Sequence, residues 1–149
     1  MQIRQATTDD CDSIYRVHSD AIHGLPRGSQ GSEGVLEWLK TRKPSVYAEE
    51  MQKETFVVVE QDGDVVGWGA LNLPKAEISN VFVDPVHHRR GIGTMILTEL
   101  EAFAQASGLT GVELRATGAA IDFYLANGYR SDKPIESNAE WALMKKSVA

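Results

Sequence analysis

The chain has 149 residues, a length typical of one domain that can bury a hydrophobic core. Its 15 Lys and Arg residues against 21 Asp and Glu residues give a formal net charge of −6. This balance argues against non-specific nucleic-acid binding and favours a cationic partner or substrate, so we expect a single domain over residues 1–149 with no nucleic-acid partner.

The first residues favour a cytoplasmic protein. Residues 1–5 lack the apolar core of a signal peptide, and no apolar run in the chain approaches the roughly 20 residues that cross a bilayer. Cys11 is the single cysteine, so no intramolecular disulfide can form and a reducing compartment is the simplest interpretation. We therefore expect a cytoplasmic location and no membrane partner.

A short strand and a helix are expected at the start of the chain. Residues 2–6 form the predicted strand, and the Thr and Asp side chains of 7–10 suit the N-cap of a helix that stops near Gly24. The following segment, 24–34, contains four glycines and a proline. It is either a connection between helices or a flap over a substrate site, and the sequence does not choose between them.

Helices and strands alternate through the rest of the chain. A second helical region begins at Ser32 and is interrupted at Pro44. Asp62-Gly63 lies between two β-branched runs, which is a strong hairpin signal. The other elements are predicted from apolar residues that recur at strand or helix spacing: strands at 56–60, 65–71, 77–83, 112–116 and 141–145, and helices at 46–52, 95–107 and 119–127.

The most informative stretch runs from His88 to Thr94, between an apolar run and a long amphipathic segment. A strand, a basic glycine-containing turn and a helix in this order present free backbone N–H groups to a phosphate. Gly91 and Gly93 let the backbone approach a ligand closely, and Arg89 and Arg90 add positive charge. The sequence therefore predicts an anion-binding turn, although a solvated surface turn is the alternative.

Several other kinds of site are missing from the sequence. The chain has no G-x-x-x-x-G-K-[ST] loop, no G-x-G-x-x-G spacing and no G-x-S-x-G nucleophile elbow. Its four histidines, at positions 18, 23, 87 and 88, do not have metal-ligand spacing with a carboxylate or a thiol, so we expect no metal. Cys11, inside the first predicted helix, is interpreted as a packing residue rather than a nucleophile.

Three motifs in order resemble the GNAT superfamily of acyl-CoA-dependent N-acetyltransferases. They are Val81-Phe82-Val83-Asp84-Pro85, then Arg89-Arg90-Gly91-Ile92-Gly93-Thr94, then the segment from Ala119 to Tyr129. The resemblance covers about residues 56–129 closely. It implies an α+β (α/β) fold with a mixed, mostly antiparallel central sheet, splayed central strands and helices on both faces. It also implies that acetyl-CoA is the cosubstrate and lies in the opening between the splayed strands.

The resemblance assigns cofactor-binding roles to individual positions. The backbone of Val83 would pair with the pantetheine arm, and Thr117 would bond to that arm or to a nearby water. His88 departs from the Gln or Arg that usually starts the family's loop motif, and its role stays open. The pyrophosphate would lie on the backbone N–H groups of Arg89, Arg90, Gly91, Ile92, Gly93 and Thr94.

The same resemblance suggests two catalytic residues. Acyl transfer to an amine needs a neutral amine and a proton for the departing thiolate. Tyr124 stands where the family places a tyrosine that acts as general acid, although a core aromatic is the alternative. Glu77 begins the strand that ends at Val83 and is the candidate general base, directly or through a water, against the alternative of a solvated carboxylate. Asn80 and Glu113 are weaker substitutes for it.

The acceptor is poorly specified by the sequence. By the resemblance, it is an amine on a small molecule or a protein, and its site is walled by the first two helices, the glycine-rich loop and the last strands. Large side chains that could line this wall, each of which also suits a structural role, are Tyr15, His18, His23, Trp38, Tyr47 and Trp68. A non-catalytic acyl-CoA sensor is the alternative function, and both a monomer and a homodimer are compatible with the sequence.

Overall fold

The computed structural model describes residues 1–24 and 32–149, and for residues 32–36 it describes the backbone only. The predicted connection or flap at 24–34 therefore lies largely outside the described residues. The strands are β1 (Gln2–Gln5), β2 (Thr55–Gln61), β3 (Asp64–Asn72), β4 (Glu77–Val83), β5 (Gly111–Thr117) and β6 (Trp141–Ser147). The α-helices are α1 (Cys11–His23), α2 (Ser32–Thr41), α3 (Ser45–Met51), α4 (Ile92–Ala106) and α5 (Ile121–Ala126).

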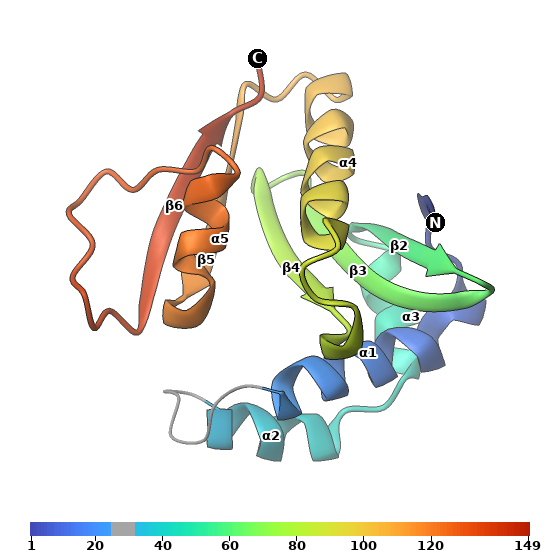
Figure 1. The fold of residues 1–149 in the computed structure, drawn as a ribbon. Coiled ribbons are helices and arrows are strands. Elements are labelled where there is room, and N and C mark those ends of the chain that lie inside the picture. The colour runs from blue at the N-terminus through green and yellow to red at the C-terminus, as the bar shows by residue number, and fades with distance from the viewer. Residues whose placement is uncertain (25–31) are drawn as a thin grey trace.

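The six strands form one sheet in chain order, from β1 to β6. All neighbouring strands are antiparallel except β4 and β5, which are parallel. These two strands pair only at Glu77 and Glu113, where the Glu113 N–H donates to the Ala76 carbonyl oxygen (2.9 Å), and they then separate toward Val83 and Thr117 (Figure 1). The expected mixed sheet with splayed central strands is therefore confirmed.

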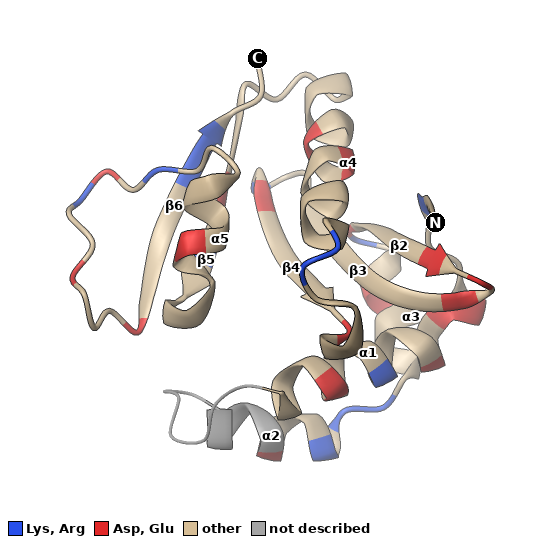
Figure 2. Ribbon diagram, viewed as in Figure 1, with Lys and Arg blue, Asp and Glu red and all other residues tan. Residues whose placement is uncertain are grey.

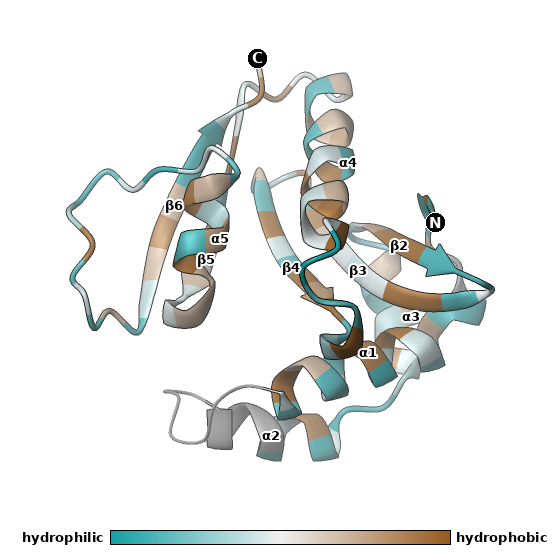
Figure 3. Cartoon of the chain, in the orientation of Figure 1, coloured by the Kyte–Doolittle hydropathy of each residue, from teal (hydrophilic) through white to brown (hydrophobic). Residues whose placement is uncertain are grey.

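Helices cover both faces of this sheet. Helix α4 packs on one face of β2, β3 and β4, while α1 and α3 pack against the opposite face (Figure 1). Because consecutive strand residues point to opposite faces, Val57 and Val59 of β2 join the core under α4, whereas Phe56 and Val58 join the core under α1 and α3. Hydrophobic residues accordingly recur along β2, β3 and α4 (Figure 3). The two cores make the strand hydrophobic on both sides.

Local sequence signals place most element ends correctly. Asp62 and Gly63 have φ values of 53° and 85°, so both central residues of the predicted hairpin turn are left-handed. Helix α4 begins at Ile92, because Gly91 forms its N-cap in a left-handed conformation and turns the chain directly into the helix. Gly108, with φ 88°, follows the end of this helix as expected.

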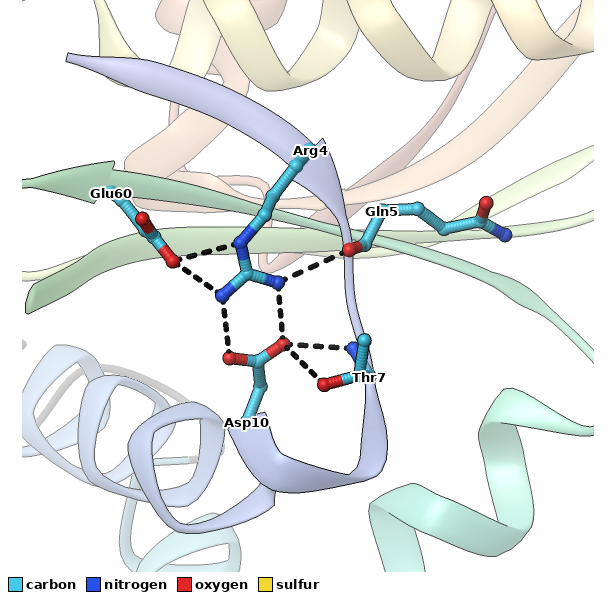
Figure 4. Close-up of polar contacts among 5 residues, drawn as sticks. All are labelled: Arg4, Gln5, Thr7, Asp10 and Glu60. Carbon is cyan, nitrogen blue, oxygen red and sulfur yellow. Dashed lines mark hydrogen bonds and ion pairs between the residues drawn. The ribbon is translucent and has the colours of Figure 1, made fainter. Parts of the chain in front are cut away.

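An ion-pair cluster fixes the start of the chain (Figure 4). Arg4 of β1 donates two hydrogen bonds to Asp10, each of 2.8 Å, and its Nε donates to Glu60 of β2 at 2.8 Å. Asp10 also accepts from the Thr7 N–H at 2.8 Å, which completes the cap predicted at 7–10. The sequence indicates the cap but not the ion pairs, because Arg4 and Glu60 are distant in the chain.

Candidate cofactor and active site

The loop between β4 and α4 presents an uninterrupted run of free backbone donors. From Arg89 to Thr94, no N–H group has a hydrogen-bond partner among the residues that the structure describes, whereas the Met95 N–H donates to the Gly91 carbonyl oxygen (3.0 Å). Basic residues of the loop, drawn blue, lie next to the N-terminal end of α4 (Figure 2). A helix N-terminus with free N–H groups and positive charge binds anions.

The backbone conformation of this loop favours convergence of its donors. Arg89 and Gly91 have φ values of 64° and 78°, so two left-handed residues alternate with ordinary ones. Such alternation turns successive N–H groups toward a common concave side. A Cβ at Gly91 would contact nothing within 4 Å, so the left-handed conformation, and not space, favours glycine there.

A buried carboxylate anchors the start of the loop. Asp84 is nearly fully buried and accepts a hydrogen bond from the Val86 N–H (3.1 Å). Arg16 of α1 donates to Asp84 at 3.3 Å and to the Val65 carbonyl oxygen at 2.7 Å. These contacts tie the turn after β4 to α1 and β3, and local sequence patterns gave no sign of them.

Two strand edges that have no backbone partner face each other where β4 and β5 separate. The Asp84 N–H donates to the Val66 carbonyl oxygen of β3 (2.9 Å). Because backbone groups of alternate strand residues point in opposite directions, those of Val83 and Val81 point away from β3, toward β5. The Glu113 N–H points toward β4, so by the same alternation Thr117 presents its backbone to the opening. An extended ligand with amide groups can pair with such edges.

Helix α5 lies against the anion-binding loop. A Cβ on Gly93 would come within 2.7 Å of Phe123 Cζ, so the ring of Phe123 occupies the space that a side chain would fill. Tyr124, the next residue, is 9% exposed, and burial raises its pKa to about 12. Its hydroxyl has no hydrogen-bond partner among the described residues. The structure therefore brings the predicted acid onto a helix that touches the predicted phosphate loop.

Glu77 lies at the opposite end of β4 from the loop. It is half-buried at the point where β4 and β5 pair, and it makes no ion pair within the described part of the chain. Val83 is the sixth residue after it along the strand, which is a span of roughly 20 Å in extended backbone. Its neighbour Ile78 packs in the core under α4, so Glu77 points to the other face of the sheet. The structure does not bring Glu77 into contact with Tyr124.

The large side chains proposed for the acceptor wall are mostly structural. Tyr47 and Trp68 are fully buried, and the His18 Nδ1 lies 2.7 Å from the Tyr47 hydroxyl. Burial lowers the pKa of His18 to about 4, so its imidazole is neutral. Trp38 is 45% exposed and stacks on the Arg42 guanidinium, 4.6 Å from its ring centroid. Tyr15 is half-buried and donates to the Leu39 carbonyl oxygen (3.1 Å), so Trp38 and His23 are the exposed members of the set.

Two further expectations concern membrane-spanning helices and metal ligands. Within residues 1–24 and 32–149, no helix combines the length and the apolar character that a bilayer crossing requires. In the same described residues, no three His, Cys, Asp or Glu side chains converge as metal ligands would.

Comparison with known proteins gives consistent matches. A family model described as the acetyltransferase (GNAT) family matches residues 24–129. An uncharacterised N-acetyltransferase of Methanocaldococcus jannaschii is 28% identical over 162 aligned residues, which cover 98% of this chain and 66% of that protein. The chain thus spans about two thirds of this relative's length.

Solved structures share the fold at low sequence identity. The PaiA N-acetyltransferase of Thermoplasma acidophilum, in complex with coenzyme A, has a TM-score of 0.82 at 17% identity, with 98% of each chain covered. A putative acetyltransferase of Salmonella typhimurium, solved with acetyl-CoA, has a TM-score of 0.70 at 18% identity. The alignment covers 100% of this chain and 94% of the Salmonella chain. At this level of identity, the likeness establishes the fold.

Proposed function

Since this chain belongs to the acetyltransferase (GNAT) family, we propose that it transfers an acetyl group from acetyl-CoA directly to an amine. The observation that carries the proposal is the run of free N–H groups from Arg89 to Thr94, which lies beside the unpaired edges of β4 and β5. The chemistry of the cofactor matches both parts, because it joins a pyrophosphate to an arm that contains amides. The two relatives solved with CoA or acetyl-CoA support the same ligand.

The residues present fit this cofactor. The N–H groups of residues 89–94 would hold the pyrophosphate, and the side chains of Arg89 and Arg90, which have no carboxylate partner among the described residues, add charge. The backbone of Val83 would pair with the arm on one side of the opening. Thr117 ends β5 on the other side and would bond to the arm or to a water there.

Tyr124 is the proposed general acid. When bound, acetyl-CoA supplies an activated acyl group whose thiol leaving group resembles a free cysteine, with a pKa of about 8.5. The Tyr124 phenol is protonated at neutral pH, and burial, which raises its pKa to about 12, favours that form further. The hydroxyl therefore has a proton available for the departing thiolate. Its lack of a partner among the described residues leaves that proton uncommitted.

Glu77 is the proposed general base for the acceptor amine. It lies at the paired end of β4 and on the face away from α4, so its action through a water suits the geometry better than direct contact. An alkylamine has a pKa near about 10, so it must lose a proton before it attacks. The acceptor is an amine of a small molecule or a protein, and the net charge of −6 favours a cationic one.

A non-catalytic sensor of acyl-CoA is the second candidate function. A sensor needs the phosphate loop and the free strand edges but has no use for a protonated phenol beside them. The combination of Tyr124 with the loop therefore favours the enzyme, although the sensor would use the same binding site.

Thermal unfolding and thiol release together test the proposal. Acetyl-CoA should raise the melting temperature, because a ligand that binds only the folded state stabilises it. Incubation with acetyl-CoA and a panel of amines should then release free thiol. Stabilisation without release by any amine would favour the sensor, and no stabilisation would contradict both functions.

A charge-matched pair of variants locates the binding site. Replacing both loop arginines, Arg89→Gln with Arg90→Gln, should weaken acetyl-CoA binding about 5- to 30-fold at low salt and less at high salt. The control, Lys43→Gln with Lys53→Gln, removes the same charge from two exposed positions away from the loop. Equal weakening in both double variants would place the cofactor elsewhere.

A further inference from the structure

His88 makes a contact that the family pattern does not predict. Its Nε2 lies 3.2 Å from the Val83 carbonyl oxygen. A carbonyl oxygen only accepts hydrogen bonds, so this contact requires the tautomer, or the protonated form, with a hydrogen on Nε2. The His88 ring is exposed, and its contact with Val83 is its one side-chain hydrogen bond within the described part of the chain.

The Val83 carbonyl is the acceptor at the mouth of the strand opening. It ends β4 and points toward the gap, because the neighbouring Asp84 N–H points toward β3. An unpaired carbonyl on a free strand edge readily takes up a new donor. In the structure, the His88 imidazole supplies that donor from within the chain.

We propose that His88 is a displaceable cap on the Val83 carbonyl, which an amide N–H of the pantetheine arm replaces when acetyl-CoA binds. The inference rests on the proposed function, because that function supplies the amide. The incoming amide and the imidazole compete for one acceptor in one place. His88 therefore opposes binding of the arm while leaving the phosphate loop unaffected.

The neighbouring His87 provides a matched control. Its Nδ1 lies 3.4 Å from an Arg90 guanidinium nitrogen, and among the described residues it makes no hydrogen bond to Val83. Replacing His87 by alanine removes an imidazole from the same loop without uncapping the carbonyl. Both histidines lie at or near the surface, so neither substitution removes core packing.

The experiment compares two ligands that differ by the arm. Calorimetry would measure Kd for acetyl-CoA and for adenosine 3′-phosphate 5′-diphosphate, the nucleotide half of the cofactor, with wild type, His88→Ala and His87→Ala. His88→Ala should lower the Kd for acetyl-CoA about two- to fivefold, because the arm no longer has to displace one exposed hydrogen bond. The Kd for the nucleotide half should stay unchanged. His87→Ala should change both ligands by the same factor or neither.

A spectroscopic measurement follows the cap itself. In ¹⁵N-resolved NMR spectra of the wild type, acetyl-CoA should shift the His88 Nε2 resonance as it loses its carbonyl partner, whereas the nucleotide half should shift it much less. The proposed cap would be wrong if the ratio of the Kd for acetyl-CoA to the Kd for the nucleotide half were the same in His88→Ala as in the wild type. It would also be wrong if His88→Ala bound acetyl-CoA more weakly than the wild type. Failure of the wild type to bind either ligand would instead contradict the proposed function.

Discussion

At the scale of single residues, two neighbouring tyrosines have different environments. Tyr124 and Tyr129 belong to one sequence motif, and both are buried. The Tyr129 hydroxyl donates to Glu101 at 2.8 Å, whereas the Tyr124 hydroxyl has no partner among the described residues. The Tyr124 oxygen is not one of the fully enclosed, unpartnered polar atoms of the described residues, so solvent or a ligand can reach it. The structure thus separates a structural tyrosine from a candidate catalytic one.

Phenylalanine substitutions should give opposite results at these two positions. Tyr124→Phe should lower kcat by about 100-fold or more, since it removes the proton donor, with little change in acetyl-CoA affinity or stability. Tyr129→Phe should reduce the free energy of unfolding by about 1.5–3 kcal/mol, because Glu101 loses a hydrogen bond, while kcat stays close to wild type. Steady-state thiol release and urea unfolding measure the two effects. Normal turnover in Tyr124→Phe would remove it from the mechanism.

At the scale of elements, local patterns predict far more than contacts between elements. The hairpin at Asp62-Gly63, the strand from Glu77 to Val83 and the end of α4 follow from turn residues and apolar spacing. The splayed strands were expected only through the family resemblance, since nothing local separates a paired parallel strand from an unpaired one. The contact of Phe123 with Gly93 was not expected, because spacing within one helix does not specify its partner.

That contact can be tested by a double-mutant cycle. Gly93→Ala would place a Cβ 2.7 Å from Phe123 Cζ, so we expect it to lower the free energy of unfolding by about 1–3 kcal/mol. Phe123→Leu shortens the opposing side chain, so the double variant should lose less stability than the two single variants summed. Gly91→Ala is the control, because its cost arises from a φ of 78° and Phe123→Leu should not relieve it. Strict additivity for Gly93 would show that the steric contact is absent.

At the scale of the whole molecule, the cofactor opening divides the sheet and α4 bridges it. Strands β4 and β5 share one pair of residues, so the ladder itself contributes little across the opening. Glu101 of α4 accepts hydrogen bonds from Tyr129 and from Lys146 of β6, at 2.8 and 2.9 Å. The helix that presents the phosphate loop therefore also holds the β5–β6 side in place. Local sequence reasoning cannot find these ties, because they join segments 28 and 45 residues apart.

The Arg4–Asp10 pair should make the stability of the whole chain depend on acid pH. Asp10 is 7% exposed, and hydrogen bonds from Arg4 lower its pKa even though burial opposes the charge. Because the folded pKa lies below the unfolded value of about 4, the stabilisation is complete above about pH 4 and is lost as the pH falls through the folded pKa. Asp10→Asn should therefore cost about 1.5–3 kcal/mol at pH 7, and the difference from wild type should shrink below about pH 4.

Urea unfolding at several pH values, with Asp9→Asn as the control, measures this dependence. Asp9 is an exposed neighbour in the same turn, without an ion pair among the described residues, so its substitution removes the same charge. The control should remain near wild-type stability at neutral pH, since exposed single charges contribute little. A gap between wild type and Asp10→Asn that stays constant down to about pH 2 would mean that the Asp10 charge is not what Arg4 stabilises. The loss would then belong to packing, because an asparagine oxygen can still accept the hydrogen bond from the Thr7 N–H.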